Sequence, residues 1–86
     1  MACHNIMTLL VNNRVQNAVK LQEVLTKSGC LIKTRLGLHE AGEICTNEGL
    51  IILQLTGTKE EIASLEKALN ELEGIKAKNT EICSEW

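Results

Sequence analysis

Apolar residues along the chain follow two different periods, and these periods predict strands and helices in a fixed order. In the second half, Ile62, Leu65 and Leu69 recur at helical spacing, whereas the apolar run at residues 50–55 is typical of a buried strand. A run of β-favouring residues marks another strand near the N-terminus. The predicted elements are a strand at 4–11, a helix at 13–28, a strand at 30–36, a strand at 50–55, a helix at 58–74 and a strand at 75–83.

Cap signals set the predicted ends of both helices. Asn13 begins a sequence similar to a capping box, and Thr58 with Glu61 forms a complete one. Gly29 and Gly74 are expected to end the first and second helix in the left-handed conformation. The two halves of the chain therefore repeat the same succession of elements.

This succession predicts the fold. Right-handed crossovers applied to two strand–helix–strand units give an α+β, ferredoxin-like βαββαβ sandwich. Its four-stranded antiparallel sheet has the order 4-1-3-2, with two helices on one face. A chain of 86 residues has room for one hydrophobic core, so residues 1–86 are expected to form a single domain.

The sheet face away from the helices is predicted to be apolar at its centre. Leu50 and Ile52 should share this face with Gln54, and both faces of the first strand would add apolar side chains. A small domain rarely leaves such a patch in water. We therefore expect a homo-oligomer, a dimer or a tetramer, that buries it, with an anionic ligand or RNA on the sheet as the less favoured alternatives.

Basic residues are expected to frame this apolar centre. In the strand at 30–36, a period of two places Ile32 and Leu36 on one side and Lys33 and Arg35 on the other. The last strand would add two further lysines. RNA remains the weakest alternative, because the RNA-binding version of this fold stacks bases on aromatic side chains and this chain has no Phe or Tyr.

Composition narrows the class of protein. Hydrophobic residues make up 44% and charged residues 23%, a globular balance, and the net charge of −2 argues against direct nucleic-acid binding. The longest apolar run, residues 50–53, is far shorter than the roughly 20 residues that span a bilayer. Without an export signal at the N-terminus, we expect a cytoplasmic protein with no membrane partner, whose four cysteines are reduced thiols.

Catalytic motifs are absent from the sequence. It contains no nucleophile-elbow, dinucleotide-binding or P-loop pattern, and it has no Asp to complete a Ser-His-Asp triad. We therefore expect that the protein is not an enzyme.

Cys and His residues gather at two places on the predicted topology. Cys3, His4 and Cys83 fall at one end of the sheet, and His39 and Cys45 fall on the hairpin loop at the opposite end. Thiolate and imidazole bind Ni, Zn or Fe, so either group could hold a transition metal. Neither group has a Cys-x-x-Cys pair. The competing interpretation is that Cys30 is a small buried hydrophobic residue, that Cys3 and Cys83 are simply terminal, and that the hairpin loop is simply solvated.

The loop between the first strand and the first helix is a candidate anion site. Asn12, Asn13 and Arg14 combine backbone donors at a helix start with a positive charge. An N-cap beside an exposed charge explains the same residues, and the sequence does not separate the two.

Two stretches carry a resemblance to a known family. Residues 26–40, TKSGCLIKTRLGLHE, and residues 49–57, GLIILQLTG, resemble small stand-alone proteins identified as regulators of the iron-only hydrogenase system, whose fold is ACT-like. The resemblance implies a regulatory domain that pairs into larger sheets and binds a small effector near the first strand–helix loop. For this chain, that loop is Asn12, Asn13 and Arg14, without the glycine-rich amino-acid loop of true ACT domains.

A more distant resemblance is to the metal-binding domain of nickel-responsive repressors. His39 and Cys45 keep the spacing of that family's second His and Cys, but Gly37 stands where its first His would be. The DNA-binding segment of those repressors is also missing. The resemblance therefore implies at most two metal ligands on the hairpin, and regulation through a partner protein.

These observations predict a non-enzymatic, ACT-like regulatory domain that acts through oligomerisation and small-effector binding. The alternative is a metal sensor or carrier that uses its Cys and His residues. The identity of the effector or metal and the partner protein stay open.

Overall fold

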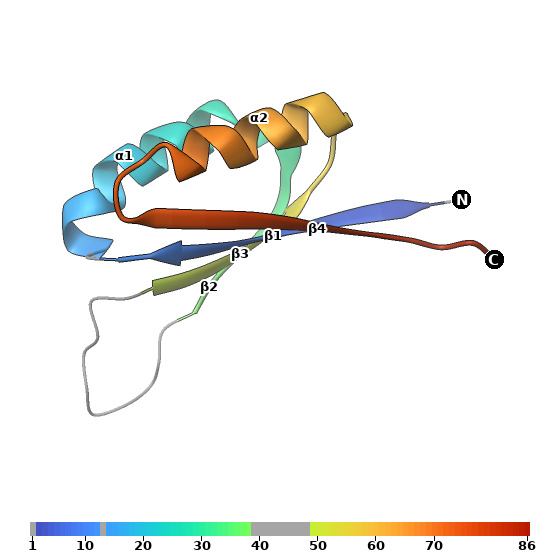
Figure 1. Ribbon diagram of the computed structural model, residues 1–86, viewed down its shortest axis with the longest axis horizontal. Coiled ribbons are helices and arrows are strands. Elements are labelled where there is room, and N and C mark those ends of the chain that lie inside the picture. The colour runs from blue at the N-terminus through green and yellow to red at the C-terminus, as the bar shows by residue number, and fades with distance from the viewer. Residues whose placement is uncertain (1, 13, 39–48) are drawn as a thin grey trace.

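The computed structural model describes residues 2–12, 14–38 and 49–86. Its sheet has the strand order β2-β3-β1-β4, with every neighbouring pair antiparallel, which confirms the predicted order 4-1-3-2 read from the other edge. Both helices cover one face of this sheet, and the fold is the predicted α+β, ferredoxin-like one (Figure 1). The elements are β1 (Cys3–Val11), α1 (Arg14–Lys27), the short 3-10 helix η1 (Gly29–Leu31), β2 (Ile32–Leu38), β3 (Gly49–Leu55), α2 (Lys59–Asn70) and β4 (Ile75–Cys83).

The core lies between the sheet and the helices. The side chains of Met7, Leu9 and Val11 point toward the helices and are at most 2% exposed, so the odd-numbered residues of β1 face the core. Sequence patterning could not decide this, because both faces of β1 are apolar. The other buried core residues are Leu21, Leu25, Leu53, Leu55, Ile62, Leu65, Leu69 and Ile75.

A β-bulge in β2 overturns the predicted alternation of that strand. Ile32 pairs with Leu55 and Thr34 with Gln54, so Lys33 is left without a partner in the register. A bulge of one residue exchanges the faces of every residue that follows it. Arg35 therefore lies on the helix side of the sheet, not on the open side as predicted.

Leu36 lies on the open side of the sheet, which is the reverse of its predicted placement. It pairs with Ile52 on the face away from the helices and is 51% exposed, whereas the period of two had placed it with Ile32. Arg35, on the helix side, donates a hydrogen bond from Nη1 to Oε1 of Gln22 on α1 at 3.0 Å. The bulge thus replaces a basic residue on the open face by an apolar one.

The two helices end differently. Gly74 is left-handed as predicted, with a φ of 78°, but α2 ends before it, at Asn70 with Glu71 as the C-cap. Gly29 is not left-handed. Instead, Ser28 leads directly into η1, where the Leu31 N–H donates to the Ser28 carbonyl at 2.9 Å and the Leu31 carbonyl accepts from Thr56 at 2.7 Å. The expectation for Gly29 was wrong because a 3-10 turn, tied to the end of β3, replaces the left-handed stop.

The capping box of α2 is confirmed. Thr58 Oγ1 accepts from the Glu61 N–H at 3.1 Å, and Glu61 Oε1 accepts from the Thr58 N–H at 2.9 Å. The corresponding prediction for Asn13 lies outside the described residues. Neither described helix is long and apolar enough to cross a bilayer.

Candidate functional site

The open face, meaning the sheet surface away from the helices, carries an apolar strip across three strands. One row of paired residues runs from Leu36 through Ile52 to Thr8, and the next contains Leu50 and Leu10. Leu36 is 51% and Leu10 37% exposed, while Ile52 and Leu50 are half-buried. In the described chain, the strip has no second layer over it.

Polar residues adjoin this strip on the β4 side and in the next row of the sheet. Lys76 and Lys78 of β4 pair with Leu10 and Thr8 and are exposed, as predicted. In the next row along β2 and β3, Thr34 donates to Gln54 Oε1 at 3.3 Å. Leu50, Ile52 and Gln54 thus share the open face as expected.

The outer edge of β4 is closed by side chains of α2. Asn70 Oδ1 accepts from the Ala77 N–H at 2.8 Å and Asn70 Nδ2 donates to the Ala77 carbonyl at 2.9 Å. One step along, Glu66 Oε2 accepts from the Asn79 N–H at 2.6 Å. A further strand would pair with the backbone groups at the free edge of β4. Because Asn70 and Glu66 already bind these groups at Ala77 and Asn79, a strand could be added here only if these hydrogen bonds were lost.

The predicted effector loop is only partly described. Asn12 is exposed, and its N–H donates to the Gly74 carbonyl at 2.7 Å, which ties the end of β1 to the turn before β4. Arg14 is the first residue of α1. Asn13 lies outside the described residues, as do His39 and Cys45 of the predicted hairpin metal site.

The sheet end brings together a different set of residues from the predicted one. Cys3 and Cys83 face each other in the β1–β4 register with Cα atoms 4.0 Å apart, and they form a disulfide. The expectation of reduced thiols was therefore wrong for this pair. A separation of 80 residues gives no pairing signal in the sequence, and only the strand register makes the two residues neighbours.

His4 does not belong to this cluster. It pairs with Ile82, one position along the strand, so it lies on the opposite face of the sheet from Cys3. Glu81 belongs to the cluster instead of His4, because Glu81 lies two residues before Cys83 and therefore on the same face of the sheet. The Glu-x-Cys spacing in a strand was a signal that the sequence interpretation missed. Cys30 is an exposed free thiol in η1.

A small hollow of about 230 Å³, lined by Glu81 and by residues of α2, adjoins this cluster. Asn5, Asn79, Glu66 and Glu81 line it together with Ile62 and Ala63, and Asn79 Nδ2 donates to Asn5 Oδ1 at 3.0 Å. Asn79 Oδ1 is buried and has no hydrogen-bond partner among the described residues. The helix side of the sheet thus changes from an apolar core to a polar row at this end.

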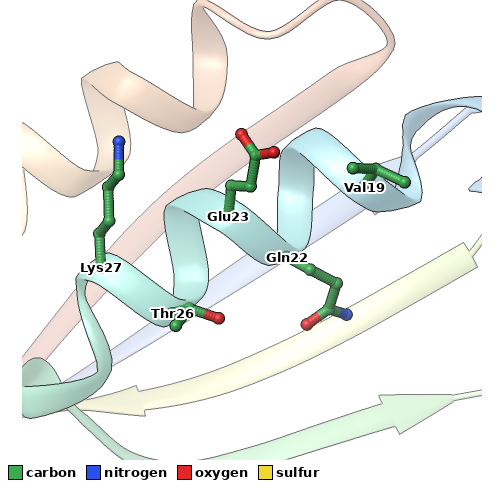
Figure 2. Close-up of a pocket in the computed structure, with 5 residues that line it drawn as sticks. All are labelled: Val19, Gln22, Glu23, Thr26 and Lys27. Atoms are coloured by element: carbon green, nitrogen blue, oxygen red, sulfur yellow. The ribbon is translucent and has the colours of Figure 1, made fainter.

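A broader hollow of about 740 Å³ lies along α1 (Figure 2). Gln22 points toward the strands and Glu23 and Lys27 toward α2, while Val19 is 68% exposed. All of its described lining residues belong to one helix, so among them no polar groups from different elements converge. It lacks the enclosed form that small-molecule sites usually have.

Comparisons with known proteins support the fold alone. No family model and no curated protein matches the chain. Among solved structures, the uncharacterized protein TM1266 from Thermotoga maritima is 23% identical with a TM-score of 0.81, and the match covers 95% of this chain and 100% of that one. CPII from Thiomonas intermedia K12, in a structure bound to ADP, AMP and acetate, is 12% identical with a TM-score of 0.55, over 93% of this chain and 86% of that one. The chain is thus similar to small domains of ferredoxin-like fold.

Proposed function

We propose that the protein is a non-enzymatic, ACT-like regulatory domain that works as a homo-oligomer and responds to a small effector. The observation that carries the proposal is the open face, where Leu10, Leu36 and Ile52 leave an apolar strip in water. Burying apolar surface stabilises association by about 25 cal/mol per Å² before the entropy of association is subtracted. A second copy of the chain presents the same strip, so a two-fold arrangement matches apolar centre to apolar centre.

The closed edge of β4 supports this geometry. Because Asn70 and Glu66 already occupy the backbone groups of Ala77 and Asn79, joining two sheets through this stretch would cost hydrogen bonds. Packing face to face costs none. The iron-only hydrogenase regulators that the sequence resembles would provide the cellular setting, in which the oligomer acts on a partner protein in the cytoplasm.

The effector would bind near the β1–α1 turn, at Asn12, Asn13 and Arg14, as the ACT-like resemblance implies. Adenine nucleotides are the first probes, because CPII was solved with ADP and AMP. A ligand changes the oligomer only if it binds the assembled and separate chains with different affinity. Native mass spectrometry with ADP, AMP and the twenty amino acids measures both binding and assembly, and Arg14→Ala should weaken any ligand bound at the turn.

A matched pair of variants tests the oligomer. Leu36→Glu places a carboxylate on the open face, and Val19→Glu places one on the outer surface of α1, where the native residue is also apolar and exposed. A buried unpaired charge is costly, so Leu36→Glu should raise the dissociation constant of the oligomer at least about tenfold, while Val19→Glu leaves it unchanged. Light scattering over a concentration series measures this constant. A monomeric native protein, or equal behaviour of the two variants, would contradict the proposal.

A further inference from the structure

At the end of the paired strands β1 and β4, three side chains that can bind a metal ion lie on one face of the sheet. Cys3, Glu81 and Cys83 lie on the helix side of the sheet, where the ribbon runs on beyond α2 (Figure 1). The ligand atoms of the three side chains all lie within 4.8 Å of one another. Cys3 and Glu81 are exposed and Cys83 is half-buried, so a dissolved ion can reach all three.

We infer that the reduced protein binds one Zn²⁺ ion through the Sγ atoms of Cys3 and Cys83 and a carboxylate oxygen of Glu81. The inference goes beyond the proposed regulatory function and does not depend on it, because the site lies at the sheet end and not on the open face. It replaces the predicted set of Cys3, His4 and Cys83, since the strand alternation turns His4 away.

The donor set suits zinc. Zn²⁺ binds thiolate at about 2.3 Å and carboxylate at about 2.0–2.2 Å, so two of its ligand atoms lie roughly 3.5–3.8 Å apart in tetrahedral geometry. Opening the disulfide lets the two sulfurs separate to this distance by side-chain rotation, while the paired strands hold their Cα atoms in place. Three protein ligands leave the fourth position to water.

Neighbouring residues favour a cation at this place. Glu66, Asn79 and Glu81 line the adjoining hollow, and Lys59 is the one basic side chain in its described lining. Deprotonated Cys3 and Cys83 with Glu81 carry three negative charges, which one Zn²⁺ ion reduces to one. The polar row therefore continues the site toward α2 with further acceptors.

The oxidation state of Cys3 and Cys83 determines whether the site can bind Zn²⁺. A phosphine reductant attacks one sulfur of the Cys3–Cys83 disulfide; the S–S bond breaks, the phosphine becomes a phosphine oxide with oxygen from water, and the two protons of that water protonate the two thiolates. Zn²⁺ then binds the dithiol and releases two protons. In the disulfide form both sulfurs are bonded to each other, so the thiolate ligands do not exist.

Metal titration of the full chain tests the inference. The protein is reduced with tris(2-carboxyethyl)phosphine without oxygen, and Zn²⁺ is titrated against a chromophoric chelator, with Co²⁺ absorption as the reporter of thiolate ligation. We expect one equivalent per chain in the reduced form and none in the disulfide form. Circular dichroism confirms that every variant is folded.

Four variants assign the ligands. Cys83→Ser should abolish stoichiometric binding and the thiolate–Co²⁺ absorption, and Glu81→Gln should weaken Zn²⁺ binding at least about tenfold. Cys30→Ser and Glu73→Gln are the matched controls, because they change a thiol and a carboxylate elsewhere, and they should bind as the native chain does. Absence of Zn²⁺ from the reduced protein, native affinity in Glu81→Gln, loss of the ion in Cys30→Ser, or half an equivalent per chain would each overturn the inference.

Discussion

The side-chain amide of Asn70 forms two reciprocal hydrogen bonds with the backbone of Ala77, accepting from its N–H at 2.8 Å and donating to its carbonyl at 2.9 Å. The same Nδ2 also donates to the Glu66 carbonyl at 3.0 Å. The last residue of α2 therefore imitates a neighbouring strand at one point of the sheet edge. This contact both fastens α2 to β4 and protects the edge.

Replacement of Asn70 should loosen this attachment. Asn70→Ala removes all three side-chain hydrogen bonds, and we expect the free energy of unfolding to fall by about 1 kcal/mol, since these bonds are partly open to water. Asn70→Asp keeps the acceptor for the Ala77 N–H but places a carboxylate oxygen against the Ala77 and Glu66 carbonyls at the C-terminus of α2, so it should lose at least as much. Urea unfolding measures the free energy of unfolding of both variants. An Asn70→Ala variant as stable as the native chain would show that water replaces the hydrogen bonds of the amide without loss of stability.

Two glycines should respond oppositely to alanine. Gly57 has a φ of 121°, and a Cβ atom there would meet Leu31 Cδ2 at 2.8 Å. Gly29 has an ordinary φ and no atom within 4 Å of such a Cβ. Gly57→Ala should lower the free energy of unfolding by at least about 1 kcal/mol, and Gly29→Ala should raise it by about 0.4–1 kcal/mol, because alanine restricts the unfolded chain.

Thermal unfolding of this pair checks both signs. If Gly57→Ala is neutral, the turn before α2 has another conformation. If Gly29→Ala is strongly destabilising, Gly29 is left-handed after all, as the sequence pattern predicted.

The capping box gives a third prediction. Thr58→Ala removes the acceptor for the Glu61 N–H and should lower the free energy of unfolding by about 1 kcal/mol, whereas Thr58→Ser keeps the hydroxyl and should lose only a fraction of that. Chemical denaturation distinguishes the two. Equal losses in both variants would assign the effect to the methyl group of threonine and not to the cap.

The disulfide should stabilise the chain through its long loop. It closes a separation of 80 residues, for which the chain-entropy account gives a stabilisation of up to about 4.5 kcal/mol. Reduction should therefore lower the urea midpoint in the native protein and leave the variant with both Cys3→Ser and Cys83→Ser unchanged. A reductant effect of equal size in that double variant would place its origin elsewhere, at Cys30.

The fold could be predicted because its signals are local. Helical spacing at Ile62, Leu65 and Leu69 marks α2, Thr58 marks its start, and the order of elements leaves few topologies. The apolar centre of the open face followed from the same patterns, since Leu50 and Ile52 had to share a side. These features depend on residues within a few positions of one another.

The incorrect predictions for β2 and for the Cys3–Cys83 pair depended on strand register, which is not visible in the sequence. The bulge at Lys33 reversed the faces of Arg35 and Leu36, because one unpaired residue changes the parity of all that follow. The Cys3–Cys83 pairing likewise arises from the alignment of two strands distant in sequence. The parity predicted for Leu50 and Ile52 was right because β3 has no bulge, whereas the parity predicted for β2 beyond Lys33 was wrong.

The bulge also bears on how this chain should be aligned with its relatives. Since Lys33 is surplus to the β2–β3 pairing, a relative with one residue fewer in β2 can keep Thr34 and Leu36 on the same face. The gap in such an alignment belongs at position 33. An ungapped alignment would match surface positions of one protein with core positions of the other, and would hide a shared apolar surface among apparently unrelated residues.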